Sequence, residues 1–172
     1  MRTLIAGACG LTLAATIAVA AQMGATPKPG LEFHTNQSLE QKGAAMLAEA
    51  PKSDGIVNTR LETYPGSYTS IIARTSSGTG ELHKRLQDNF FVVSGEATVI
   101  VGGRIIDPKD TAPDEVRGTR VEGGESRVMH KGDVLHVPAN TPHQTVLAPG
   151  ATFVYYVVKV EEPTARMMPA AK

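Results

Sequence analysis

The sequence predicts a single all-β domain, a sandwich or barrel, with one short helix near its N-terminus. Three observations favour this fold class. A chain of 172 residues fits one domain of about 100–200 residues. From residue 57 onward, short runs of strand-forming residues alternate with turn signals, which is typical of all-β folds. The chain also contains no repeat with the period of a helical solenoid or a propeller.

The composition excludes several functional classes. The chain has 17 basic and 17 acidic residues, so its formal net charge is zero, whereas general nucleic-acid binding needs an excess of positive charge. Its one cysteine cannot form an internal disulfide. The glycine-rich and nucleophile-elbow motifs of nucleotide-binding proteins and serine hydrolases are absent from the sequence.

Residues 1–21 are predicted to be a secretory signal peptide. A positive start, Met1-Arg2, precedes an uncharged apolar run, and Ala18-Val19-Ala20 matches an A-x-A cleavage signal. Two alternatives stay open. About 20 apolar residues can also span a bilayer as an uncleaved anchor, and Cys9 follows a short stretch that weakly resembles a lipoprotein acylation site.

Cleavage leaves a mature protein of about 150 residues that has no cysteine. Thiol nucleophiles and thiolate metal ligands are then excluded. Removal of Arg2 leaves 16 basic residues against 17 acidic ones, so the charge balance is kept. We therefore expect a periplasmic or secreted protein with no nucleic-acid partner and no stable membrane insertion after cleavage.

Residues 22–56 are expected to form an extended lead and a short helix outside the main domain. The lead is rich in Pro and Gly and has little periodicity. Ser38 and Gln41 match a capping box at the start of the helix. The helix is expected to end near Glu49, before Pro51.

Residues 57–161 are expected to form the barrel from about nine or ten strands. Gly102-Gly103 and Gly123-Gly124 each predict a two-residue hairpin turn. Residues 107–118 are interpreted as an exposed charged loop, and residues 162–172 as a flexible tail. The main predicted strands cover residues 67–74, 90–93, 97–101, 134–138, 144–147 and 152–160.

Two segments contain the residue types that carry chemistry. The first begins with Glu81-Leu82-His83, followed by Asp88 five residues after the histidine and by Gly95 seven residues after the acid. The second segment runs from Gly132 to His143 and contains Pro138. The combined spacing of both segments is more specific than a single histidine pair.

This double register resembles the two motifs of the cupin superfamily. The resemblance covers residues of about 65–160 and implies a double-stranded β-helix, a small jelly-roll barrel. Asn140 replaces a glycine of the second motif, and asparagine tolerates positive φ angles better than most residues. The resemblance also implies a small-molecule ligand in the barrel and a homodimer. The matching positions are His83, Asp88, Gly95, Gly132, Pro138 and His143.

The resemblance implies a metal site formed by Glu81, His83, Asp88 and His143. Metal-binding members usually present three His and one Glu, whereas here Glu81 stands at the first His position and the shorter Asp88 at the acid position. Leu147 stands where many members have Asn. Two imidazoles with carboxylates and open coordination positions suit Fe(II), Mn(II), Ni(II) or Zn(II).

Strand geometry supports part of this site from the residues alone. Glu81 and His83 are two residues apart, so on a strand both side chains point to one face. If a metal does not need every carboxylate, Glu81 is our candidate for a catalytic general base.

A metal-free barrel is the alternative. In that case His83 and His143 contact a ligand or each other, Asp88 caps a turn, and Glu81 is solvated. His136 is a third candidate ligand contact, although we favour its interpretation as a packed core histidine.

Other polar residues have weaker claims to the site. Surface solvation is the favoured interpretation of the basic residues near the first motif, ahead of attraction of an anionic substrate, and packing is the favoured interpretation of the tyrosines. We also expect two histidines outside the motifs to be solvated. These residues are Lys84, Arg85, Arg74, Tyr64, Tyr68, Tyr155, Tyr156, His34 and His130.

Three functions are therefore considered. The first is an exported barrel that binds a small molecule with a divalent metal, which suits dioxygenase, isomerase or lyase chemistry. The second is a metal-free barrel that binds or senses a small ligand without catalysis. The third is a structural module whose strands mediate dimerisation.

Overall fold

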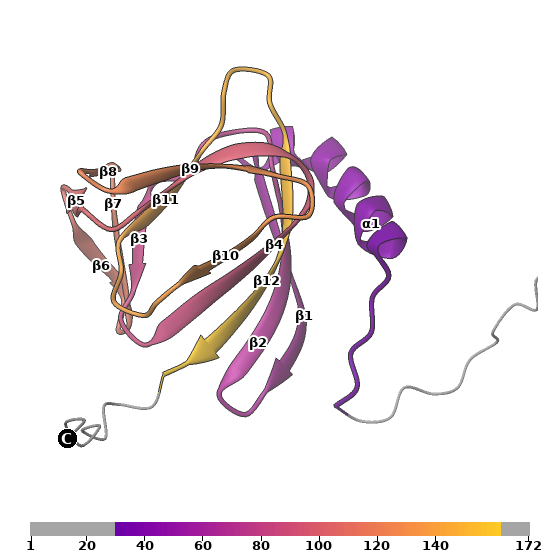
Figure 1. Cartoon of the computed structure of the whole chain (residues 1–172), viewed down its shortest axis with the longest axis horizontal. Helices are drawn as coiled ribbons and strands as arrows, with labels where there is room; N and C mark the ends of the chain where they lie inside the picture. The colour runs from indigo at the N-terminus through magenta and orange to yellow at the C-terminus, as the bar shows by residue number, and fades with distance from the viewer. Residues whose placement is uncertain (1–29, 163–172) are drawn as a thin grey trace, which may run out of the picture. The chain divides into compact units, whose positions relative to one another are not determined.

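We analysed the protein as a computed structural model (Figure 1). The structure describes residues 30–162, so the predicted signal peptide and the tail beyond residue 162 lie outside the described residues. The chain divides into two compact units, Met1–Leu31 and Glu32–Lys172, and all helices and strands of the described residues lie in the second unit. Within the described residues, no helix is both long and apolar enough to cross a membrane.

The predicted helix is present as α1 (Asn36–Glu49), which is followed by a short 3₁₀ turn, η1 (Ala50–Lys52). Its cap differs from the prediction. Thr35 is the N-cap residue, and its hydroxyl accepts a hydrogen bond from the Ser38 amide at 3.1 Å. Gly43 lies where α1 packs on the sheet, and a Cβ there would lie only 2.6 Å from a methyl group of Val154. A residue that is unfavourable in a helix interior therefore permits close packing here.

In the described part of the chain, twelve strands follow the helix, more than the sequence indicated. The sheet formed by most of them is antiparallel and curls around an interior (Figure 1). The strands are β1 (Ile56–Tyr64), β2 (Ser67–Arg74), β3 (Gly80–His83), β4 (Leu86–Val101), β5 (Arg104–Ile106), β6 (Lys109–Ala112), β7 (Glu115–Gly118), β8 (Arg120–Glu122), β9 (Glu125–His130), β10 (Val134–Val137), β11 (His143–Val146) and β12 (Phe153–Glu161).

The long strand β4 joins the two halves of the barrel. Its first half pairs with β12 on one side and β10 on the other, and its second half pairs with β11 and β9. The change of partners falls at Gly95, which has a φ of 80° and where a Cβ would overlap the Thr152 carbonyl. This curled antiparallel sheet fits a cupin barrel, and the predicted all-β double-stranded β-helix with a short N-terminal helix is confirmed.

Both predicted Gly-Gly hairpins are wrong. The strands on either side of each glycine pair do not pair with each other, because β5 pairs with β8 and β4 pairs with β9. The two glycine pairs instead face one another, and a Cβ at Gly103 would overlap the Glu122 carbonyl. Each glycine pair is therefore a corner. On one side of the two corners β4 pairs with β9, and on the other side β5 pairs with β8, both antiparallel.

The interpretation of residues 107–118 as an exposed loop is also wrong. Most of this segment forms the hairpin of β6 and β7, and β7 continues the sheet beside β3. In that register Arg117 lies opposite Glu81, and Glu115 lies opposite His83. The hairpin thus carries two charged residues to the first motif.

The interior of the barrel is partly apolar. Its buried cluster includes Phe90, Phe153 and Tyr155, and the rings of Phe90 and Tyr155 are stacked with centroids 4.7 Å apart. Leu147 packs into the same cluster, so the residue that departs from the family pattern contributes to packing.

Candidate functional site

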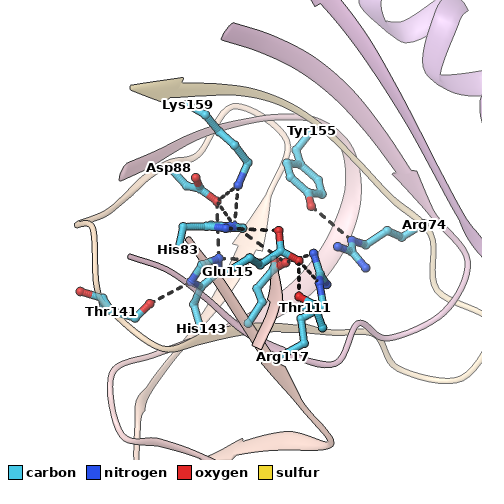
Figure 2. Close-up of polar contacts among 11 residues, drawn as sticks. Arg74, His83, Asp88, Thr111, Glu115, Arg117, Thr141, His143, Tyr155 and Lys159 are labelled. Carbon is cyan, nitrogen blue, oxygen red and sulfur yellow. Dashed lines mark hydrogen bonds and ion pairs between the residues drawn. The ribbon is translucent and has the colours of Figure 1, made fainter. Parts of the chain in front are cut away.

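A cavity of about 370 Å³ lies inside the barrel. This volume is within the usual range for small-molecule sites. Its wall combines apolar residues with a concentration of ionisable side chains. Figure 2 shows the polar contacts among many of these ionisable residues. The acidic, basic and histidine residues of the lining are Asp54, Arg74, Glu81, His83, Asp88, Glu115, Arg117 and Lys159.

The four predicted metal-site residues come together at one place. Glu81 and His83 lie on β3, Asp88 on β4 and His143 on β11, where His143 is opposite Glu81 in the strand register. Ligand atoms of Glu81, His83 and His143 all lie within 4.8 Å of one another, so this triad could bind a metal. Asp88 is adjacent, with Oδ2 3.4 Å from Nε2 of His143.

His143 has the orientation expected of a metal ligand. Its Nδ1 lies 3.0 Å from the Thr141 carbonyl, which fixes a proton on Nδ1. The opposite nitrogen, Nε2, is buried and has no hydrogen-bond partner in the described part of the chain. It faces Glu81 Oε1 at 3.4 Å. Metal-binding histidines typically donate their other N–H to a backbone carbonyl or a carboxylate in this way.

The turn of the second motif holds the first motif in place. Asn140 adopts a φ of 57°, as its replacement of a glycine led us to expect. Its backbone N–H donates a 2.7 Å hydrogen bond to the carbonyl of His83. The two motifs are therefore linked directly through the main chain.

Lys159 is a central residue that the sequence analysis missed. It is 8% exposed, and its Nζ lies 2.7 Å from Nε2 of His83 and 2.5 Å from Oδ2 of Asp88. Figure 2 shows its side chain reaching toward both residues. The period of β12 contained the signal, because Val157 and Lys159 alternate with less buried neighbours and share the inner face with Tyr155.

The contacts around the two carboxylates keep both of them ionised. Burial alone would raise the pKa of Glu81, but His143, Lys159 and Arg117 outweigh it and hold that pKa well below its usual range. Burial also opposes ionisation of Asp88, and interactions with His143 and Lys159 again lower its pKa. Both groups therefore remain anionic without a metal.

The pKa values of the two histidines are shifted in opposite directions. Burial and the neighbouring Lys159 ammonium lower the pKa of His83, so its imidazole is neutral. Burial would also lower the pKa of His143, but Asp88 and Glu81 outweigh it and raise that pKa to about 9. His83 can thus accept a hydrogen bond at Nε2, whereas metal-free His143 carries a positive charge at neutral pH.

Two further site residues come from the misread hairpin. Arg117 Nη2 lies 2.8 Å from Oε2 of Glu81, and its Nε also pairs with Glu115. Glu115 Oε2 lies 3.7 Å from Nδ1 of His83. Sequence reasoning missed these residues because a loop interpretation assigns them no partner strand.

The environment of the basic residues near the first motif differs from one to the next. The predicted surface position of Arg74 is wrong: it is only 7% exposed, lines the cavity and donates a hydrogen bond from Nε to the Tyr155 hydroxyl at 3.2 Å. On the outside of the barrel, Lys84 pairs with Asp110. Arg85 pairs with Glu161 there.

Three of the alternatives for individual residues are corrected. His136 is neither a packed core histidine nor a cavity contact, because it is exposed and its Nδ1 meets Oδ1 of Asn89 at 2.9 Å. On β10 the buried residue is instead Val137, which is 1% exposed. Asp88 lies within a strand and caps no turn, and Glu81 is buried and therefore not solvated.

Several solved structures of other proteins are similar to this chain at low sequence identity. No family model matches the chain, and no curated protein matches it. Similar solved structures include the cupin domain of Cnp3 from Schizosaccharomyces pombe, at 12% identity, covering 62% of this chain and 65% of that one, with a TM-score of 0.48. The chain thus spans less than two thirds of that structure.

Two further structures are similar at comparable levels. KdgF from a Halomonas species is 19% identical, with coverage of 64% of this chain and 83% of that chain and a TM-score of 0.46. A Klebsiella pneumoniae protein with a double-stranded β-helix domain is 15% identical, with coverage of 63% and 78% and a TM-score of 0.46. At these levels of similarity, we base the fold on this chain's own strand order and register.

The fold and the site together define a class of protein. It is a small double-stranded β-helix barrel with a buried Glu/His/His group that could bind a metal, and two members of this group, Glu81 and His83, line the cavity.

Proposed function

We propose that the barrel is the active site of an enzyme that binds a small molecule beside a divalent metal held by Glu81, His83 and His143. The observation that carries this proposal is the convergence of the three side chains, whose ligand atoms lie within 4.8 Å of one another while His143 Nδ1 is anchored to Thr141. Without a metal, Nε2 of His143 is protonated and faces the carboxylates of Glu81 and Asp88, and a bound metal would replace that proton. Fe, Mn, Ni and Zn all suit this set of donors.

When bound, such a metal would supply Lewis-acid polarisation of a substrate oxygen. The protein's own groups would orient the substrate and control protons. Lys159 presents an ammonium group at the cavity wall, where it can donate a hydrogen bond to a substrate oxygen. For His83 to use Nε2 as a ligand, Lys159 must release its hydrogen bond to that atom.

This geometry also changes the assignment of a general base. Glu81 is paired with Arg117, and its pKa is held well below the usual range, so it is a weak proton acceptor. Its better role is as an anionic metal ligand. Because His83 is also a metal ligand in this proposal, Lys159 at the cavity wall is the stronger candidate for proton transfer.

Metal binding by the purified full chain tests the proposal. Chelated protein would be titrated with Zn²⁺, Mn²⁺, Ni²⁺ and anaerobic Fe²⁺ and the bound metal measured by elemental analysis. We expect one metal per chain in the wild type and loss of that metal in the His83→Ala, His143→Ala double variant. His130→Ala is the matched control, because His130 is an exposed histidine that pairs with Glu96. Wild type that retains none of the four metals would refute the proposal.

A metal-free ligand-binding barrel is the second candidate. The hydrogen bond between Lys159 Nζ and His83 Nε2 favours it, because the ammonium then occupies the coordinating lone pair of that histidine. Lys159→Met separates the two candidates. If the lysine competes with a metal, the variant binds metal more tightly than wild type. If neither protein binds metal, and a small ligand raises the wild-type melting temperature in the presence of chelator, the second candidate is supported.

We also propose export and homodimer formation, which are supported by the sequence alone. N-terminal sequencing of the mature protein from a bacterial periplasm tests cleavage after the A-x-A signal at residues 18–20. Sedimentation at micromolar concentration tests the dimer, and a monomer would refute it.

A further inference from the structure

The cavity has a second polar feature away from the metal-binding triad. Arg74 Nε donates to the hydroxyl of Tyr155, and both residues line the cavity wall. Figure 2 shows this pair to one side of the group formed by Lys159, Asp88 and His83. Nothing in the arrangement of the triad requires an arginine at this position.

The charge of Arg74 is buried without an anionic partner. Its side chain is more than nine-tenths buried, and Nη1 is fully enclosed with no hydrogen-bond partner in the described part of the chain. No Asp or Glu side chain among residues 30–162 forms an ion pair with it, whereas Arg117 has two such partners. An arginine stays charged in proteins, and a buried charge without a partner carries a large desolvation penalty.

The surrounding backbone makes room for this guanidinium. Gly78 also lines the cavity, and a Cβ at that position would lie only 2.8 Å from Nη1 of Arg74. The Tyr155 hydroxyl accepts the Nε–H of Arg74, so its own hydrogen is free to point elsewhere. The site therefore offers guanidinium N–H groups and a phenolic O–H beside each other.

We propose that the Arg74–Tyr155 end of the cavity binds a carboxylate group of the ligand. The part of the Arg74 guanidinium that lines the cavity can donate a charge-assisted hydrogen bond to a carboxylate oxygen, and the Tyr155 hydroxyl supplies a further donor. The ligand class is then a small organic acid, with its carboxylate at Arg74 and its reacting oxygen near Lys159 and His83. This inference rests on the proposed function only in placing the ligand in the same cavity.

Calorimetric titration of the chelated full chain with malonate tests the inference, with the uncharged malonamide as the matched ligand. We expect malonate to bind and malonamide to bind at least tenfold more weakly. We expect Arg74→Gln to weaken malonate binding roughly 10- to 100-fold, because hydrogen bonds to charged groups are among the strong ones. Arg120→Gln is the matched surface control, since Arg120 is exposed and pairs with Glu122 on the same strand, and it should bind malonate as wild type does.

Several results would overturn the inference. They are equal binding of malonate and malonamide by wild type, wild-type malonate affinity in Arg74→Gln, and tighter Arg74-dependent binding of inorganic phosphate than of malonate. If Arg74→Gln does not fold, the wild-type comparison of malonate with malonamide and the Tyr155→Phe variant still decide. In Tyr155→Phe we expect roughly 2- to 10-fold weaker malonate binding.

Failure of this inference is distinguishable from failure of the metal proposal. The malonate titration is performed with chelator, so it does not depend on metal. Arg74→Gln should keep the metal stoichiometry of wild type, whereas the double histidine variant should lose metal and keep Arg74-dependent malonate binding.

Discussion

Buried charged groups have ionic partners at one end of the cavity and lack a directly contacting ionic partner at the other end. At one end, Asp88 and Glu81 face Lys159, His143 and Arg117 at distances of 2.5–3.4 Å. At the other end, Arg74 contacts a tyrosine hydroxyl and has no anionic partner among the described residues. The first end is electrostatically balanced by direct ion pairs, whereas at the second end Arg74 has no negative group in direct contact among the described residues and interacts with Glu81 only at longer range.

This difference separates stability from function. Paired buried charges become costly when one partner is removed, because the other is left uncompensated. A buried charge with no partner already carries that penalty in the ligand-free protein. The balanced end should therefore be sensitive to mutation, and the unbalanced end should be tolerant until a ligand is present.

The largest expected effect is at the balanced end. Asp88→Ala removes the carboxylate that contacts Lys159 and faces His143, and we expect it to destabilise the protein by about 3–5 kcal/mol in urea unfolding. The control is Asp110→Ala, which breaks the exposed pair with Lys84 and should cost about 0–1 kcal/mol. Equal effects of the two substitutions would contradict the comparison.

The pH dependence of the chelated protein probes the same end. His143 has a folded pKa raised to about 9 from 6.5, so its contribution to stability is complete below pH 6.5 and is lost as pH rises through about 9. That contribution is about 3 kcal/mol at most, at 1.36 kcal/mol per pKa unit. Unfolding free energies from pH 6 to 10 measure it. A His143→Phe variant should lack this slope, and a flat wild-type profile would contradict the prediction.

Metal binding should stabilise the folded chain by mass action. At 100 times the dissociation constant, Zn²⁺ should add about 2.7 kcal/mol to the free energy of unfolding. The His143→Ala variant should show no such gain, while the exposed His130→Ala variant should match wild type. Thermal melting with and without the metal measures this difference. A gain in His143→Ala equal to that of wild type would place the metal elsewhere.

The smallest expected effect is at the unbalanced end. Arg74→Met removes a buried charge that has no anionic partner, so we expect the stability of the ligand-free protein to change by no more than about 1 kcal/mol. Urea unfolding measures this change beside that of Asp88→Ala. A loss as large as that of Asp88→Ala would show that Arg74 is already compensated within the protein.

Local periodicity predicted a good part of the site. Glu81 and His83 share a face because strand side chains alternate with a period of two, and both point inward as expected. Asn140 adopts the positive φ that its position required. The motif spacing also predicted that His143 lies in the same cluster as Glu81 and His83.

The missed residues depend on pairing between distant segments. Arg117 and Glu115 reach the site only because β7 pairs with β3, and no local pattern distinguishes that strand from a charged loop. The Gly-Gly corners failed for a related reason. A local turn signal does not show whether its flanking strands pair with each other or with more distant strands.

By itself, the sequence determined the all-β class, the two motifs and which side chains on a strand share a face, because these follow from local geometry and spacing. Only the tertiary structure decided which charges meet. Lys159 lies between Asp88 and His83 because β12 pairs with β4, and Arg74 is buried without an anionic partner among the described residues because β2 closes the other side of the cavity. Electrostatic balance in a barrel depends on distances between strands that are far apart in the sequence, and no local pattern encodes those distances.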